Sequence, residues 1–229
     1  MQEAKTGIGT LNEKSVHAQL KDLLANSSDK CEVKVGRYFI DIVRDDQFIE
    51  IQTGNFSSIR KKLQNLLKEH RVRLVYPLAQ EKLIRKFDRA GKEISKRKSP
   101  KRCTVFDVFS ELIYIPEIMQ HENFELEVIL MRVEETRCDD GAGSWRRNGV
   151  SIVDRKIREI VESRIFRKPQ DLLDILEIQP SEEFTNKQLA TRLGIPRHLA
   201  SKITYTLRNM SAIEQVGKSA NAYIYRIKP

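Results

Sequence analysis

The sequence has 229 residues, of which 40% are hydrophobic and 32% charged, so it describes a globular chain with room for one large domain or two modest ones. Lys and Arg number 41 against 32 Asp and Glu, and the net charge of +9 favours a polyanionic partner. No apolar run approaches the roughly 20 residues of a membrane span, and the three scattered cysteines suggest neither a disulfide framework nor a zinc site. We therefore expect a cytoplasmic protein without a membrane partner.

The first quarter of the chain alternates helical and strand-like patterns. The order strand, helix, strand implies a βαβ crossover with parallel pairing, and a turn at Asp45-Asp46 implies an antiparallel hairpin before it. Together they predict an α+β unit built on a mixed sheet. The predicted elements are, in chain order, a helix over residues 10–26, strands over 33–43 and 47–53, a helix over 57–70 and a strand over 72–77.

The middle of the chain predicts an extension of this first domain. A basic run, Lys96 to Arg102, precedes a helix that begins near Thr104. A strand over residues 124–135 then leads into a glycine-rich loop, and the spacing of the apolar residues in 153–163 predicts a helix.

The last fifty residues predict helix, turn, helix and β-hairpin. Thr185 and Gln188 form a capping box at the start of the first helix, and Gly194 ends it. A second helix and the hairpin "AIEQVGKSANAYIYRI" follow, which is the pattern of a winged helix-turn-helix. We expect three parts: a first domain with its extension over residues 1–150, a helical connector over 151–180, and a winged helix over 181–229.

Two acids are predicted to face each other in the first hairpin. With the turn at Asp45-Asp46, Asp41 lies opposite Glu50 on one face, beside apolar residues and with no Lys or Arg evident between them. A divalent cation would reconcile the two charges. The alternatives are that one acid is protonated or that the face is solvated.

Asp41, then Glu50-Ile51-Gln52 on the next strand, then a βαβ crossover resembles the PD-(D/E)xK nuclease superfamily over about residues 9–77. The resemblance implies a restriction-endonuclease-like mixed sheet flanked by helices, and phosphodiester hydrolysis with Mg²⁺ or Mn²⁺. It implies that Asp41 and Glu50 hold the metal, with Glu13 as a further ligand, although Glu13 also fits a capping box with Thr10. Gln52 stands where the family has lysine, and Ile40 where it has proline; Gln52 would help to place the attacking water.

Further residues suit contacts with nucleic acid. Some lie near the start of the helix that follows the glutamine strand, some in the loop around Trp145, and some on the second helix and wing of the C-terminal part. These candidates are Asn55, Arg60, Lys61, Arg146, Arg147, Arg197, Ser201, Tyr205, Arg208 and Lys218.

The sequence thus predicts a metal-dependent DNA endonuclease targeted by a winged helix, working as a homodimer if it cuts both strands. Acids that point to opposite sides of the sheet, or a Lys or Arg wedged between them that neutralises both, would end the nuclease interpretation. One alternative is a non-catalytic DNA-binding regulator on a nuclease-like scaffold, which the glutamine at position 52 favours. Another is a protein-interaction module whose basic charge is incidental.

Overall fold

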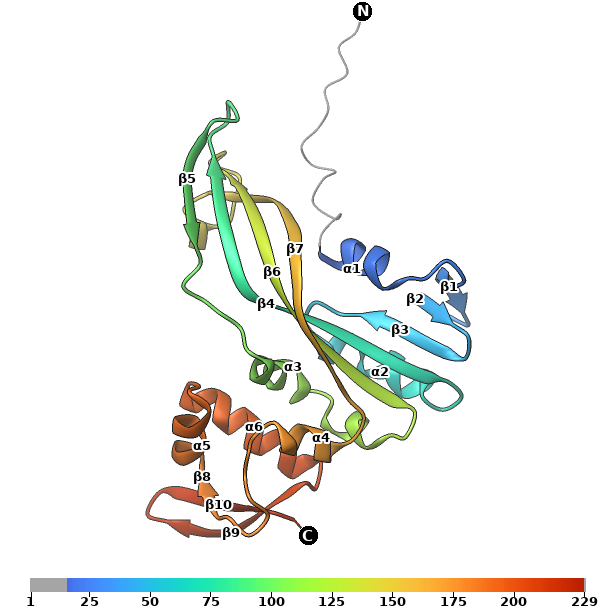
Figure 1. The fold of residues 1–229 in the computed structure, drawn as a ribbon, viewed down its shortest axis with the longest axis vertical. Helices are drawn as coiled ribbons and strands as arrows, with labels where there is room; N and C mark the ends of the chain where they lie inside the picture. Colours follow the sequence, from blue (N-terminus) through green and yellow to red (C-terminus); the bar gives the residue numbers. More distant parts are fainter. Residues whose placement is uncertain (1–15, 229) are drawn as a thin grey trace, which may run out of the picture. The chain divides into compact units, whose positions relative to one another are not determined.

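The computed structural model describes residues 16–228 as a mixed α/β protein. The strands of its main sheet are β1 (Lys30–Val35), β2 (Tyr38–Arg44), β3 (Gln47–Ile51), β4 (Arg71–Phe87), β5 (Glu93–Lys98), β6 (Phe124–Cys138) and β7 (Ser151–Phe166). They are joined in the order β1-β2-β3-β4-β6-β7, with β5 paired to β4 (Figure 1). The expected α/β class with a mixed sheet and flanking helices is confirmed.

A second, three-stranded sheet has the order β8-β10-β9. Within residues 16–228, no helix combines the length and apolar character needed to cross a membrane. The remaining elements are β8 (Phe184–Thr185), β9 (Ile213–Ser219), β10 (Ala222–Ile227), α1 (Val16–Leu24), α2 (Phe56–Leu66), α3 (Phe109–Leu112), α4 (Pro169–Asp174), α5 (Asn186–Leu193), α6 (Arg197–Asn209), and the 3₁₀ turns η2 (Val105–Val108), η3 (Pro116–Gln120) and η4 (Trp145–Arg147).

The described chain divides into two compact units. Strands β4, β6 and β7 are long enough that each contributes residues to both units. Unit 1 comprises residues 16–27, 77–104 and 129–163; unit 2 comprises residues 28–76, 105–128 and 164–228.

Unit 2 begins with three antiparallel strands. The single strand expected over residues 33–43 is wrong: Gly36, with φ +57°, and Arg37 form a turn, so Val35 pairs with Tyr38 and the segment is a hairpin of β1 and β2. Glycine adopts this left-handed conformation without strain, which is why the chain reverses there.

The βαβ crossover predicted after this hairpin is confirmed. β3 pairs with β4 in parallel register, Glu50 beside Leu74, and α2 connects them (Figure 1). Phe56 and Leu63 of α2 are fully buried, and the Phe56 ring meets Tyr76 edge-on with centroids 4.9 Å apart. This packing holds the start of α2 against β4, and Lys62 in the middle of the helix reaches Glu50 of β3.

The helix pair and hairpin predicted near the C-terminus are also present in unit 2. Thr185 Oγ1 accepts the Gln188 backbone N–H at 3.3 Å, while Gln188 Oε1 accepts the Thr185 N–H at 2.8 Å, so the capping box is confirmed. Gly194, with φ +63°, ends α5. One face of α6 packs on α5 and on α3.

In unit 1, the helix expected over residues 153–163 is wrong, because this segment is part of strand β7. Its apolar residues are Ile and Val, and such β-branched side chains favour a strand. Arg132 and Glu159 form an ion pair with N and O atoms 2.5 Å apart, which links β6 to β7. Gln19 of α1 bonds the β7 backbone, donating to Arg155 O at 2.6 Å and accepting from Ile157 N–H at 2.9 Å. These bonds satisfy two backbone groups of β7, which is an edge strand of this sheet within residues 16–228.

Candidate active site

The hairpin of β2 and β3 has the register that the sequence predicts. Val43 pairs with Phe48 and Arg44 with Gln47, and the same register continued past Ile42–Ile49 places Asp41 opposite Glu50. Asp41 Oδ2 accepts the backbone N–H of Ile51 at 2.8 Å, so the Asp41 carboxylate lies beside the end of β3. The two acids therefore occupy neighbouring positions on adjacent strands.

Glu50 is buried, and a lysine that the sequence reading overlooked contacts it. Lys62, in the middle of α2, places its Nζ 2.6 Å from Glu50 Oε2 and also donates to Phe39 O. The expectation that no Lys or Arg lies near the acids is wrong for Glu50. The other oxygen, Oε1, is buried and has no hydrogen-bond partner among residues 16–228. Lys62 therefore satisfies only half of the carboxylate.

Burial raises the pKa of Glu50 to about 7, although the hydrogen bond and charge of Lys62 lower it. The charge of Asp41 contributes to the rise, whereas a hydrogen bond from the Asp41 backbone lowers the pKa. The effect of the charge follows from the position of Asp41 opposite Glu50 on the neighbouring strand.

A second acid of low exposure, Glu125, lies less deeply within the protein than Glu50 and is paired with several cations. Glu125 of β6 is 7% exposed and Glu50 is 8% exposed, yet their pKa values move in opposite directions. Burial raises the pKa of Glu125, but hydrogen bonds from Arg73 and Arg167 outweigh it and the net pKa is lowered. Glu50 has one cation where Glu125 has several, so Glu50 is the acid left undercompensated.

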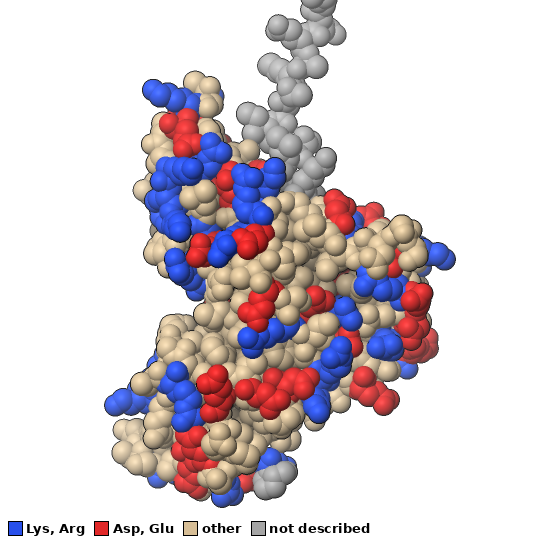
Figure 2. Space-filling view, in the orientation of Figure 1, with Lys and Arg blue, Asp and Glu red and all other residues tan. Residues whose placement is uncertain are grey.

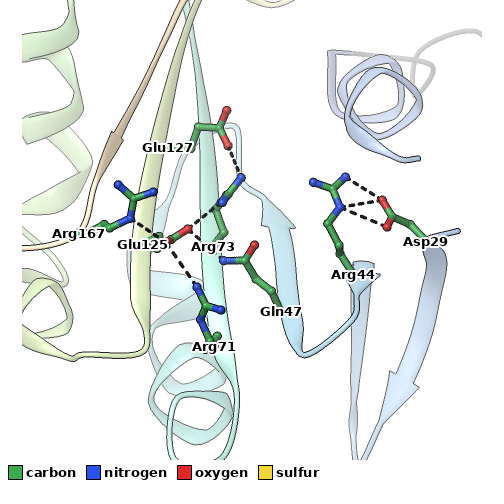
Figure 3. A network of polar contacts seen from close by, with 8 residues as sticks. All are labelled: Asp29, Arg44, Gln47, Arg71, Arg73, Glu125, Glu127 and Arg167. Carbon is green, nitrogen blue, oxygen red and sulfur yellow. Dashed lines mark hydrogen bonds and ion pairs between the residues drawn. The ribbon is translucent and has the colours of Figure 1, made fainter. Parts of the chain in front are cut away.

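Figure 3 shows the network that compensates Glu125. Arg73 donates to Glu125 at 2.9 Å and to Glu127 at 3.5 Å, while Arg167 and Gln47 donate to Glu125 at 3.0 Å each. Every carboxylate drawn there is matched by an arginine. We interpret this network as structural, because it leaves the buried acids paired within the protein.

Gln52, expected to help place a water, turns toward its own loop. Its side chain donates to Gly54 O, and its backbone N–H donates to Val75 O at 2.9 Å. The one positive charge that contacts Glu50 among residues 16–228 comes from Lys62 of α2. The predicted βαβ crossover could have indicated this contact, because a crossover places its helix across the neighbouring strands.

The start of α2 is already occupied by an acid. Glu111 Oε2 accepts the Phe56 backbone N–H at 3.0 Å, so this amide is not open to a phosphate. This differs from the expectation that the start of the helix contacts nucleic acid. Asn55 has φ +57° and accepts from Ser57 Oγ at 2.7 Å, while Arg60 pairs with Glu117 at 2.6 Å. Of the three predicted contacts in this segment, Lys61 alone is exposed without such a partner among the described residues.

Glu13, the third predicted metal ligand, lies outside the described residues. Within residues 16–228, no three His, Cys, Asp or Glu side chains gather closely enough to form a metal cluster. The described part of the candidate site thus consists of Asp41, Glu50 and Lys62.

The predicted contacts on α6 form one exposed line. Arg197, Ser201, Tyr205 and Arg208 follow the helical repeat and are all exposed, whereas Thr204 of the same helix is buried. Lys218 lies over the Tyr223 ring in the β9–β10 hairpin, 5.8 Å from its centroid. The remaining predicted contacts, Arg146 and Arg147, belong to η4 in unit 1.

Comparison with known proteins gives two matches. The family described as "Domain of unknown function (DUF8091)" matches residues 14–167, a stretch that contains Asp41, Glu50 and Lys62 and ends beside the end of β7. A protein of Treponema pallidum (strain Nichols), described as "Uncharacterized protein", is 30% identical over 223 residues, which are 97% of this chain and 88% of that protein. No solved structure matches the chain.

Proposed function

We propose that this chain, which belongs to the DUF8091 family, is a metal-dependent nuclease that hydrolyses phosphodiester bonds of DNA. The observation that carries the proposal is the buried, unpartnered Oε1 of Glu50, next to Asp41 and with Lys62 on the other oxygen. A carboxylate oxygen buried without a partner is costly, and a ligand that approaches it would remove the cost.

The arrangement of the acids supports the resemblance to PD-(D/E)xK nucleases. Asp41 and Glu50 lie on adjacent antiparallel strands, and a βαβ crossover with parallel β3 and β4 follows them. The restriction-endonuclease-like fold is part of the proposal. Lys62 takes the place of the lysine that is absent at Gln52, reaching the site from the helix instead of the strand.

The residues present fit a divalent ion. Carboxylate oxygens of Asp41 and Glu50 are donors that Mg²⁺ and Mn²⁺ prefer. When bound, such an ion supplies a water of lowered pKa and neutralises charge on the phosphate. Lys62 holds Glu50 in place and offers a positive charge to the phosphate oxygens of the substrate. Glu50 must be ionised to hold the ion, so metal binding competes with the proton that burial favours there.

The C-terminal part is proposed to be a winged helix that targets the site to DNA. Helices α5 and α6 and the β9–β10 hairpin have the expected order, and the exposed line from Arg197 to Arg208 would enter the major groove. Cutting both strands of a duplex takes two sites, which a homodimer would supply. Three free cysteines, at positions 31, 103 and 138, fit the proposed cytoplasmic location.

The alternative is a non-catalytic DNA-binding regulator on the same scaffold. Two observations favour it: Lys62 already neutralises one oxygen of Glu50, and the Gln52 side chain is engaged by Gly54. An interaction module that binds a protein instead of DNA is a third proposal. It would leave the exposed arginines of α6 without a phosphate partner.

Incubation with plasmid, single-stranded and branched DNA separates these functions. We expect cleavage with Mg²⁺ or Mn²⁺ that EDTA stops and that Asp41→Ala and Glu50→Ala each reduce by at least about 100-fold, because each removes a metal ligand. Lys62→Met should lower the rate, whereas Lys68→Met, an exposed lysine of unit 2 outside the predicted contacts, should not.

Glu69→Ala, an exposed acid of unit 2, is the control for lost charge. Retarded DNA without cleavage under either metal would favour the regulator. If the protein neither retards nor cleaves DNA, the interaction module is the function that remains.

A further inference from the structure

A basic hollow lies in unit 1, on the face of the sheet where β4 and β5 pair. Its volume is about 400 Å³. In the ladder, Ile84 pairs with Arg97 and Lys86 with Ser95, so these four side chains share one face and form the floor. The charged residues of the lining are Lys86, Arg97, Arg137, Arg146, Arg147 and one acid, Asp139.

Most of the net positive charge of the chain lies in residues 77–104, whose Lys86 and Arg97 line the hollow. Residues 77–104 contain ten Lys or Arg against three Asp or Glu, which accounts for seven of the nine excess positive charges. Figure 2 shows the blue side chains crowded over the segment that Figure 1 labels β5. A surface with this density of one charge draws polyanions toward it.

Some of the cations are held by acids, and at least one is not. Lys86 pairs with Asp139 at 2.6 Å, and Arg137 pairs with Glu135 at 2.6 Å, which fixes the wall of the hollow. Arg97 is exposed on β5 and has no acidic partner among residues 16–228. Its guanidinium is therefore open to an anionic ligand.

The loop over residues 139–150 is tightly closed. Gly143 N–H donates to Gly149 O at 2.8 Å, and a Cβ at Gly143 would lie 2.0 Å from Val150 O, so only glycine fits there. Asp140 Oδ1 accepts from Ala142 N–H at 3.0 Å and from Ser151 Oγ at 2.8 Å. These bonds fix the loop before any ligand arrives, which lowers the entropy cost of binding.

The loop carries the single tryptophan of the sequence, Trp145, which is 81% exposed. The Arg146 guanidinium lies over its ring, 5.4 Å from the centroid. Proteins that bind single strands combine an exposed aromatic ring, on which unpaired bases stack, with a basic surface that binds the backbone. Trp145 and the basic hollow offer both.

We infer that unit 1 binds single-stranded nucleic acid, with a backbone phosphate in the basic hollow and an unpaired base on Trp145. The guanidinium of Arg97 suits the geometry of phosphate oxygens, and so do the terminal nitrogens of Arg147, whose Nε donates to Val150 O at 3.1 Å. Bases in a duplex are stacked on one another, so Trp145 selects a strand that is not paired. This binding uses none of the acids in unit 2 and stands whether or not the protein cleaves DNA.

Trp145 provides the measurement, because the intrinsic tryptophan fluorescence of this protein comes from it alone. In EDTA, so that no cleavage occurs, an oligothymidylate of about 20 nucleotides should quench that fluorescence saturably, whereas an abasic oligomer of equal length should quench little. Trp145→Ala, followed by the anisotropy of a labelled oligomer, should weaken binding roughly 5- to 150-fold.

Arg97→Gln should weaken binding several-fold and reduce the slope of log K against log salt by about 0.7, the value for one lost phosphate contact on a single strand. Lys156→Gln removes an exposed charge of the same unit outside the hollow and should change neither quantity. The inference is overturned if Arg97→Gln and Lys156→Gln behave alike, if the oligomer binds without affecting Trp145, or if polyglutamate binds as tightly. If DNA quenches Trp145 but the protein does not cleave DNA with either metal, the nuclease proposal is refuted and the inference about unit 1 is supported.

Discussion

Glu50→Gln is expected to stabilise the metal-free protein above neutral pH. The pKa of Glu50 rises from 4.5 to about 7 in the folded state, so the native state holds this proton more tightly than the unfolded chain does. Stability from this group is therefore full below about pH 4.5 and is lost as the pH rises through about 7. At about pH 8 the ionised Glu50 costs up to ~3 kcal/mol, from 1.36 kcal/mol for each pKa unit.

Glutamine resembles the protonated form and still accepts a hydrogen bond from Lys62. We expect the free energy of unfolding of Glu50→Gln, measured with urea in EDTA, to match wild type near pH 4 and to exceed it by ~1–3 kcal/mol near pH 8. Glu69→Gln, at an exposed position of unit 2, should show no such pH dependence. A Glu50→Gln protein no more stable than wild type at pH 8 would show that Glu50 carries no burial penalty.

Glu135→Gln should have the opposite effect, a large loss of stability. Glu135 is fully buried in unit 1, and three cations surround it: Arg137 at 2.6 Å, Arg155 at 2.9 Å and Lys82 at 3.2 Å. Burial raises the pKa of Glu135, but these cations outweigh it and the pKa falls to about 2. Removing the charge leaves three cations uncompensated, which typically costs about 3–5 kcal/mol.

The contribution of Glu135 should also disappear in acid. Because its folded pKa is lowered, the stability it provides is present above about pH 4.5 and is lost as the pH falls toward 2. Urea unfolding of wild type and Glu135→Gln should therefore converge at low pH. Glu159→Gln breaks an exposed pair with Arg132 and should cost about 1 kcal/mol or less. If Glu135→Gln and Glu159→Gln lower the free energy of unfolding equally, the buried cluster around Glu135 does not stabilise the protein more than an exposed ion pair does.

Local patterns predicted several elements well. Thr185 and Gln188 mark a helix start whatever the rest of the fold does, because both partners lie within one turn. The hairpin register followed from the turn at Asp45 and Asp46 and from the alternation of Phe48 with its neighbours. These features depend on contacts between residues close in sequence.

The features that were predicted wrongly from the sequence depend on partners distant in the chain. The segment from residue 153 has apolar residues at helical spacing, yet strand β6 and Gln19, more than a hundred residues earlier, hold it as β7. Glu111 caps the Phe56 amide from 55 residues away. Neither contact leaves a trace in the local pattern.

The candidate site was predicted only in part for the same reason. Asp41 and Glu50 belong to one hairpin, so their proximity could be read from the turn. Lys62 reaches Glu50 from the next helix, and its role depends on the angle at which α2 crosses β3. The basic run at residues 96–102 could be recognised in the sequence. That Arg97 of this run lies near Arg137 and the loop of Trp145 could not, because the sheet brings these segments together.

Calorimetric titration with Mn²⁺ tests the pair of acids most directly, without depending on the choice of substrate. At about pH 8, where Glu50 is ionised, we expect Mn²⁺ to bind the wild-type protein and Glu69→Gln alike. Asp41→Asn and Glu50→Gln should each abolish this binding. If wild type takes up no Mn²⁺, or if both substitutions leave its affinity unchanged, Asp41 and Glu50 do not hold a metal together.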